Sequence, residues 1–193
     1  MPPRLAPESY KEKIITRFPS RRDVLAVYGF VVFVVYSWTM LSSLWKLPSW
    51  LYSLDAGQIV SVYAYSFVFD FIESVLILLP LLFIAVILPA QFWKINFVAN
   101  GVLIVVILIA SLTAHVYFYF INGTPIAFVS TQKVWLAITA LIAIIALWAL
   151  HKTAWLRNGL RGLADSSLIF LYIYPTLTVV SFFIVAARNL MRF

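Results

Sequence analysis

The sequence contains five apolar segments that are each long enough to cross a lipid bilayer. Crossing about 30 Å of hydrocarbon takes roughly 20 helical residues, and the five predicted spans are residues 23–44, 59–88, 97–121, 134–150 and 168–187. Strands of a membrane barrel alternate apolar and polar residues, and these segments do not. The sequence therefore predicts an all-α integral membrane protein, a bundle of five transmembrane helices.

The composition excludes several classes of protein. Of the 193 residues, 64% are hydrophobic and only 11% are charged, whereas a soluble domain carries about 25% charged residues. The chain has no cysteine, so disulfides, thiolate nucleophiles and cysteine metal sites are excluded. The net charge of +7 lies in the tail and loops beside apolar spans. Anionic lipids explain it better than nucleic acid does.

The basic residues predict the orientation of the chain, because lysine and arginine concentrate in cytoplasmic loops. With the N-terminus inside, ten of them lie on the inner side and four on the outer side. The inner set is Arg4, Lys11, Lys13, Arg17, Arg21, Arg22, Lys94, Lys152, Arg157 and Arg161, and the outer set is Lys46, Lys133, Arg188 and Arg192. We expect an inside N-terminus and an outside C-terminus, in a bacterial inner membrane or an organellar membrane.

The pattern predicts a terminal tail followed by one domain. Residues 1–22 form a basic cytoplasmic tail, in which residues 10–18 have the spacing of a short amphipathic helix on the membrane surface, and residues 23–193 form the transmembrane domain. The loop at residues 151–165 repeats the combination of basic and large apolar side chains. Contacts with anionic lipid headgroups are expected from Arg21, Arg22, Lys152, Arg157 and Arg161.

Two predicted spans contain a proline. Pro80 removes the hydrogen bond to the carbonyl of Leu76, and Pro175 does the same for Leu171. Both positions are therefore candidate helix kinks. A kink of this kind serves packing in many membrane helices, and it serves as a hinge or a broken-helix ion site in others.

A candidate intramembrane polar cluster consists of Asp70, Glu73 and His115. Asp70 and Glu73 are three residues apart, so they share one face of a helix. Asp70 precedes the inner end of its span at Leu88 by 18 residues, and His115 follows the start of the next span at Phe97 by 18 residues. Because the connector is short, we expect the two helices to be antiparallel neighbours, with Asp70 and His115 at one depth.

Three interpretations of this cluster stay open. The side chains could join two helices, they could form an entry point for protons or cations, or His115 could ligate a haem or a chlorophyll-type pigment. Two carboxylates and one histidine resemble a metal-ligand set, but their spacing matches no metal motif and assigns no metal. No cofactor is predicted, and His115 is the position at which a pigment would bind.

The short loops, the bulky aromatic spans and the absence of catalytic motifs favour a non-catalytic accessory or scaffold subunit of a larger membrane complex, such as a respiratory or photosynthetic one. Its partners would be anionic lipids and other membrane subunits, with no nucleic acid. The first alternative is a small transporter, or a component of an ion or proton channel, that uses Asp70, Glu73 and His115. The second is a membrane enzyme or a cofactor-binding subunit. No catalytic residue is assigned.

Overall fold

The computed structural model of the chain describes residues 18–88, 93, 96–122 and 125–190, together with their side chains except within 120–130. All secondary structure in these ranges is helical, which confirms the predicted class. The helices are α2 (Arg21–Ser53), α3 (Ala56–Ile87), α5 (Phe97–Asn122), α6 (Pro125–Lys152), α7 (Ala154–Ser167) and α8 (Phe170–Leu190). The amphipathic stretch expected at residues 10–18 lies almost wholly outside the described residues.

Five of these helices, α2, α3, α5, α6 and α8, are long and apolar enough to cross a membrane. Their number agrees with the prediction, but several boundaries differ. Helix α2 continues to Ser53 with Pro48 inside it, and α6 begins at Pro125 rather than near residue 134. Proline is well suited to the first turn of a helix, where its missing N–H would have no partner.

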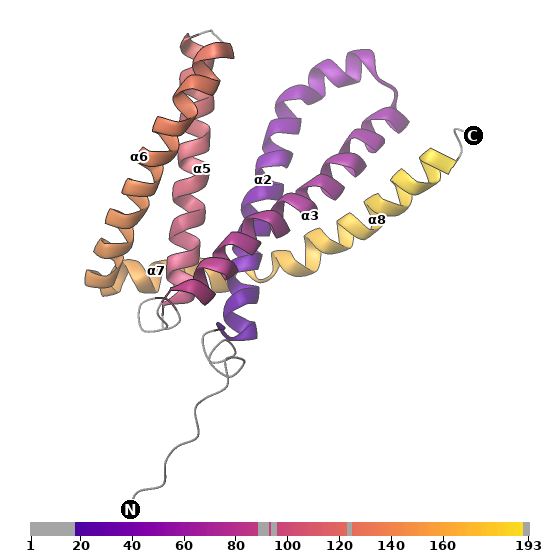
Figure 1. The fold of residues 1–193 in the computed structure, drawn as a ribbon. Helices are drawn as coiled ribbons and strands as arrows, with labels where there is room; N and C mark the ends of the chain where they lie inside the picture. The colour runs from indigo at the N-terminus through magenta and orange to yellow at the C-terminus, as the bar shows by residue number, and fades with distance from the viewer. Residues whose placement is uncertain (1–17, 89–92, 94–95, 123–124, 191–193) are drawn as a thin grey trace, which may run out of the picture.

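Helix α7 corrects the expectation of a loop at residues 151–165. Its apolar residues gather on one face and its basic residues on the other, which is the pattern of a helix that lies in the plane of an interface. Figure 1 shows α7 lying across the ends of the long helices, between α6 and α8. Trp155 and Leu163 are exposed on it.

Side chains determine where the first two long helices begin. The backbone N–H of Asp23 donates to Oγ of Ser20 over 3.1 Å, so Ser20 caps α2. At α3, Asp55 accepts from the N–H of Gln58 over 2.8 Å, and the Gln58 side chain accepts from the N–H of Asp55 over 3.1 Å. This reciprocal capping box stops the chain from continuing α2 directly into α3.

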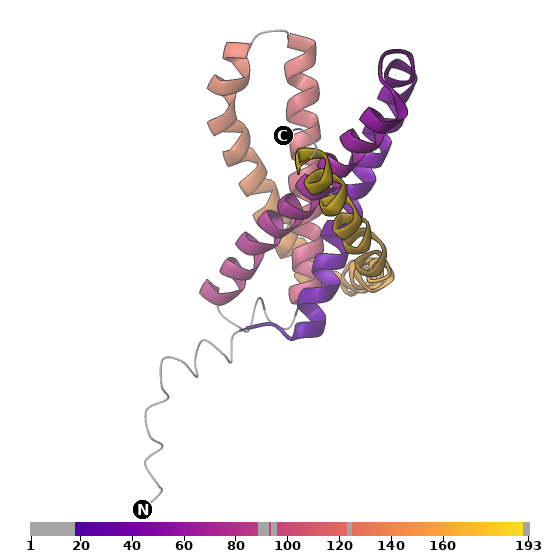
Figure 2. The ribbon, with the colours of Figure 1, turned by 90° about the vertical axis from the view of Figure 1, so that its right-hand side faces the viewer.

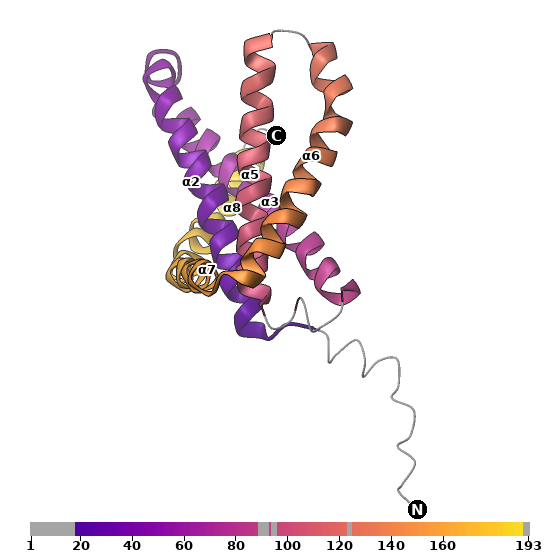
Figure 3. The same cartoon turned by 90° about the vertical axis from the view of Figure 1, so that its left-hand side faces the viewer.

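The long helices form two antiparallel hairpins, α2 with α3 and α5 with α6, and α8 packs along α3. We call the end where α2 begins and α7 lies the base, and the opposite ends of the hairpins the tips. Figures 2 and 3 show the two hairpins close together at the base and diverging toward their tips. The spans therefore do not form one closely packed parallel bundle.

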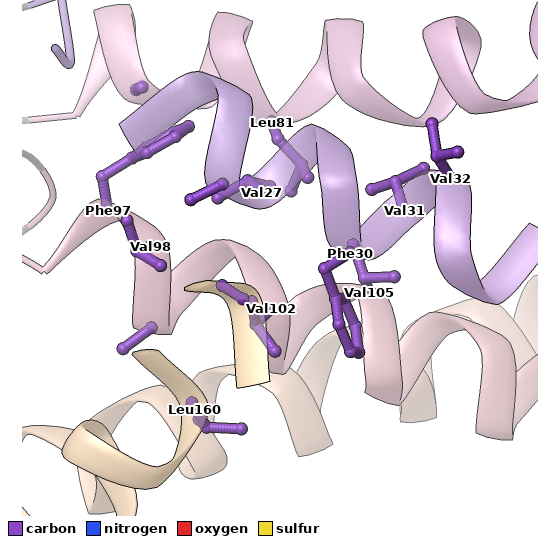
Figure 4. Close-up of a cluster of buried hydrophobic side chains, with 14 of the residues drawn as sticks. Val27, Phe30, Val31, Val32, Leu81, Phe97, Val98, Val102, Val105 and Leu160 are labelled. Carbon is purple, nitrogen blue, oxygen red and sulfur yellow. The ribbon is translucent and has the colours of Figure 1, made fainter. Parts of the chain in front are cut away.

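The hydrophobic core lies at the base, where α2 crosses α5 and α7 (Figure 4). Val27, Val102 and Val105 are fully buried there, and Leu160 of α7 contacts the same cluster. Gly101 permits the close approach, because a Cβ atom at this position would lie 3.1 Å from both methyl carbons of Val27.

Polar side chains join the helices above this core. The hydroxyl of Tyr36, which is fully buried, donates to the carbonyl of Phe67 over 3.2 Å and is also hydrogen-bonded to Thr178. This group links α2, α3 and α8. In the other hairpin, the indole N–H of Trp135 donates to the hydroxyl and carbonyl oxygens of Ser111.

The expected pairing of the second and third spans is wrong for most of their length. Helix α3 packs on α2 and α8 and makes only limited contact with α5, whereas α5 packs on α6, α7 and α2. A short connector keeps the base ends of α3 and α5 near each other, but α3 leans away along α8 (Figure 1). Sequence distance from the connector therefore does not determine which side chains meet.

Candidate functional site

Asp70 is a buried carboxylate in one of the five long apolar helices. It lies in the middle of α3 and is only 4% exposed. Its Oδ1 accepts a hydrogen bond of 2.7 Å from the hydroxyl of Thr39 on α2. Its Oδ2 is buried and has no hydrogen-bond partner among the residues that the structure describes. A buried carboxylate oxygen without a partner is costly, so it calls for a bound proton, a ligand or an ion.

Asp70 lines a cavity of about 630 Å³, which we call the charged cavity. Glu73, one turn further along α3, and Arg188 of α8 line the same cavity. Its walls also include Trp38, Thr39, Val62, Tyr65, Ser66, Phe69 and Leu112. Two carboxylates and one guanidinium thus face one space, and together they would carry one net negative charge when all are ionised.

Helix α8 brings Arg188 to this cavity. Helix α8 starts at the base and runs alongside α3 toward the tip of the α2–α3 hairpin (Figure 1). Near its end, Asn189 accepts a hydrogen bond of 3.0 Å from the hydroxyl of Tyr65. This bond holds the last turn of α8 against α3, where Arg188 is half-buried.

A second cavity, the apolar groove, adjoins the charged cavity. Its volume is about 490 Å³, and it lies between α2, α3 and α5. The two cavities share Trp38, Thr39, Glu73 and Leu112, and the groove is completed by Val34, Val35, Ile77, Ile109, Thr113, Val116 and Tyr117. The groove extends toward the base at Ile77 of α3 and toward the tip at Val116 and Tyr117 of α5, so it lies beside the charged cavity, between the two hairpins.

His115 of α5 packs on α6, within the α5–α6 hairpin. Its ring stacks on Trp135 of α6 with a centroid distance of 4.8 Å and an interplanar angle of 13°. Its Nε2 is 3.4 Å from the hydroxyl of Thr131, also on α6. The structure therefore brings Asp70 and Glu73 to one cavity and gives Asp70 and His115 different partners, Thr39 on α2 for Asp70 and Trp135 on α6 for His115.

This arrangement also bears on the metal and pigment alternatives. Within the part of the chain that the structure describes, no three His, Asp or Glu side chains are grouped so that they could hold a metal ion. His115 is 5% exposed, and a pigment at its Nε2 would have to displace Thr131. Neither alternative gains support from the geometry around His115.

The two candidate kinks lie on the helices that carry the charged groups. Pro80 is inside α3 and Pro175 is inside α8, and both helices continue through them without interruption. Both prolines are on the base side of the charged cavity, since Pro80 follows Glu73 toward the base and Pro175 precedes Arg188 toward the tip. Kinks at these positions stay a prediction.

The five residues expected at lipid headgroups all lie at the base. Arg21 and Arg22 begin α2, Lys152 ends α6, and Arg157 and Arg161 belong to α7. The guanidinium of Arg161 also donates to Oδ1 of Asn96 over 3.0 Å, which ties α7 to the start of α5. Contact with headgroups stays a prediction, but the common position of these five residues is compatible with it.

Thr39, Arg188 and Trp38 line the charged cavity but are not among the site residues predicted from the sequence. Thr39 is inconspicuous because threonine is common in membrane helices, and Arg188 was counted only as a charge that sets orientation. Trp38 did carry a signal, because of the seven tryptophans it is the one that falls well inside a predicted span. An indole away from the interfaces is a reason to look for a partner or ligand.

Comparison with known proteins adds no information to this geometry. No family model, characterised protein or solved structure that we compared with the chain matches it. The function must therefore be argued from the site itself, which is the pair of adjoining cavities around Asp70, Glu73, Trp38 and Arg188.

Proposed function

We propose that this chain is a small membrane carrier, or the binding subunit of one, and that it binds a monovalent cation in the charged cavity. The observation that carries the proposal is Asp70, which lines the cavity and whose buried Oδ2 has no hydrogen-bond partner among the described residues. Ionisable groups inside a membrane mark ion and substrate pathways. A cation at this wall would supply the missing partner.

The charges at the site set the valence of the ligand. Asp70 and Glu73 offer two negative charges, and Arg188 in the same cavity balances one of them. One positive charge on the ligand then makes the site neutral, which matters because an unbalanced charge is costly in a medium of low dielectric constant. A divalent cation would leave an excess positive charge.

Two features support a carrier rather than a fixed binding site. The charged groups lie on α3 and α8, which each contain a proline at which a membrane helix can bend. The α2–α3 and α5–α6 hairpins touch mainly at the base (Figure 3), so their tips can approach or separate with little loss of packing. Movement of this kind would open and close the charged cavity.

The orientation of the chain completes the proposal. The basic residues Arg21, Arg22, Lys152, Arg157 and Arg161 lie at the base, so we place the base on the cytoplasmic or equivalent side. The tips would then face the outside, and the charged cavity would lie nearer the outer side of the membrane than the inner side. The host membrane would be a bacterial inner membrane or an organellar membrane.

Binding of simple cations by the purified chain in lipid nanodiscs tests the proposal. We would titrate sodium, potassium and methylammonium by calorimetry, and expect saturable binding of at least one of them that Asp70→Asn weakens at least tenfold. Asp55→Asn is the matched control, because it removes one carboxylate outside the cavity and asparagine still caps a helix. Equal binding by Asp70→Asn would overturn the proposal, as would the absence of binding by every monovalent cation tested, larger amines included.

An accessory subunit of a larger membrane complex is the second candidate. Of the most apolar stretch of each helix, only 11% is buried in α6 and 6% in α8. Phe182 and Phe183 of α8 are both exposed. A photo-crosslinking residue at Phe183 in native membranes should then capture one polypeptide in stoichiometric yield. Crosslinking to lipid alone would count against this candidate and leave the carrier proposal in place.

A further inference from the structure

We infer that the ligand is a lipophilic organic cation, whose protonated amine occupies the charged cavity while its hydrocarbon part occupies the apolar groove. The inference rests on the proposed function and adds the chemical class of the ligand. It starts from the four residues that line both cavities, namely Trp38, Thr39, Glu73 and Leu112. Shared walls make the two spaces parts of one amphipathic site.

The shared walls suit the charged end of such a molecule. Glu73 offers a carboxylate at the junction, and the indole of Trp38 is 58% exposed beside it. Cations bind to the face of tryptophan more strongly than to any other aromatic side chain. An ammonium group at the junction would therefore meet a carboxylate and an aromatic ring together.

The unpartnered oxygen of Asp70 distinguishes between kinds of ammonium group. Oδ1 already accepts from Thr39, and Oδ2 accepts from nothing in the described part of the chain. A protonated primary amine carries three N–H donors, whereas a quaternary ammonium carries none. Among ammonium groups, only one with an N–H donor supplies the hydrogen bond that Asp70 lacks.

The groove explains why the rest of the ligand should be apolar. Val34, Ile77, Ile109 and Val116 line a space of about 490 Å³, which falls in the range of small-molecule pockets, roughly 300–1,000 Å³. A hydrated inorganic ion gains nothing from these walls, but a hydrocarbon chain does.

Titration of three amines separates this inference from the proposed function. The probes are methylammonium, n-hexylammonium and N,N,N-trimethylhexylammonium, and binding to the chain in nanodiscs is measured by calorimetry against empty nanodiscs. We expect n-hexylammonium to bind at least about tenfold more tightly than methylammonium, because five additional methylene groups leave water. We expect the trimethyl probe to bind at least about tenfold more weakly than n-hexylammonium.

A pair of variants on α5 locates the hydrocarbon part. Val116→Trp fills the groove and should remove the advantage of the hexyl chain while methylammonium still binds. Val106→Trp makes the same change at an exposed position of α5 that lines neither cavity, and it should retain the advantage. Equal effects of the two variants would overturn the assignment of the groove.

The remaining outcomes are distinct. Equal affinity for methylammonium and n-hexylammonium would overturn the lipophilic ligand and leave the cation site intact. Equal affinity for the primary and trimethyl hexyl probes would overturn the N–H donor to Asp70. Failure of all three amines, and of sodium and potassium, to bind would overturn the proposed function and this inference together.

Discussion

The hydroxyl of Thr39 donates a hydrogen bond of 2.7 Å to Oδ1 of Asp70, and this bond joins α2 to α3 at the wall of the charged cavity. Thr39→Val removes the donor with little change in shape. Hydrogen bonds between membrane helices are worth about 1 kcal/mol, so we expect the free energy of unfolding to fall by about that amount. Reversible unfolding in mixed micelles with increasing SDS measures it.

Thr39→Ser is the control for this prediction, because serine retains the hydroxyl. It should recover most of the lost stability and most of the cation affinity. If Thr39→Val were as stable as the parent, the hydrogen bond would not be the link between the two helices. A loss of stability in Thr39→Ser alone would come from packing of the threonine methyl group, which valine retains.

The sequence was sufficient to predict the five long apolar helices, though not α7, and to single out Asp70 and Glu73 at the candidate site. Long apolar segments identify spans because a helix is the structure that satisfies its own backbone in lipid. Asp70 and Glu73 stood out because carboxylates are costly in such segments. Thr39 and Arg188 did not, since a threonine in a membrane helix and an arginine at the end of a span are ordinary on their own.

The partner of His115 could not be predicted in the same way. Counting residues from a connector gives depth along the helix axis, about 1.5 Å per residue, but it gives neither the tilt of a helix nor the direction of a side chain around it. Packing on α8 tilts α3, and stacking on Trp135 holds His115 to α6. Both depend on contacts between segments far apart in the sequence.

Gly29 should be intolerant of any side chain. A Cβ atom at Gly29 would lie 3.1 Å from the carbonyl oxygen of Ser167 and 3.3 Å from the Cα of Leu168. These are backbone atoms at the junction of α7 and α8, and they cannot move aside as a side chain can. We expect Gly29→Ala to lower the free energy of unfolding by about 1–3 kcal/mol, the usual cost of overpacking.

Gly159→Ala is the matched control, because a Cβ at Gly159 of α7 meets nothing within 4 Å. Alanine favours a helix over glycine by about 1 kcal/mol, so this variant should be as stable as the parent or slightly more so. Unfolding by SDS compares the two variants. A Gly29→Ala protein as stable as Gly159→Ala would show that α2 and the α7–α8 junction are not in close contact.

His115 should support the α5–α6 hairpin without contributing to the cation site. His115→Phe keeps an aromatic ring to stack on Trp135 but loses the nitrogen that lies 3.4 Å from Thr131. We expect a loss of stability of about 1 kcal/mol and unchanged affinity for methylammonium. A tenfold loss of affinity, comparable with that of Asp70→Asn, would instead restore His115 to one cluster with Asp70 and Glu73.

Anionic lipid should stabilise the chain through the basic residues of the base. The double variant Lys152→Gln with Arg157→Gln removes two of the five residues predicted to contact headgroups. Each basic residue near an anionic surface contributes about 1 kcal/mol. We expect the melting temperature of the parent to rise when phosphatidylglycerol replaces part of the phosphatidylcholine in nanodiscs, and this rise to be smaller in the variant.

Lys46→Gln with Lys133→Gln serves as the comparison, since these two lysines lie toward the tips on α2 and α6. We propose that the base makes the main contact with anionic lipid. We therefore expect this double variant to reduce the rise in melting temperature less than Lys152→Gln with Arg157→Gln does. An equal response of all three proteins to phosphatidylglycerol would contradict the assignment of Lys152 and Arg157.

The orientation can be measured directly because the chain contains no cysteine. A single cysteine at Ser53 reports on the tip of α2, and one at Gly159 reports on α7 at the base. With basic residues at the base and five spans, we expect a membrane-impermeant maleimide added to intact cells to label Ser53→Cys. It should label Gly159→Cys only after the membrane is permeabilised. The opposite pattern would reverse the orientation and place the charged cavity nearer the cytoplasmic side. Labelling of both Ser53→Cys and Gly159→Cys from outside would mean that residues 53 and 159 lie on the same side of the membrane.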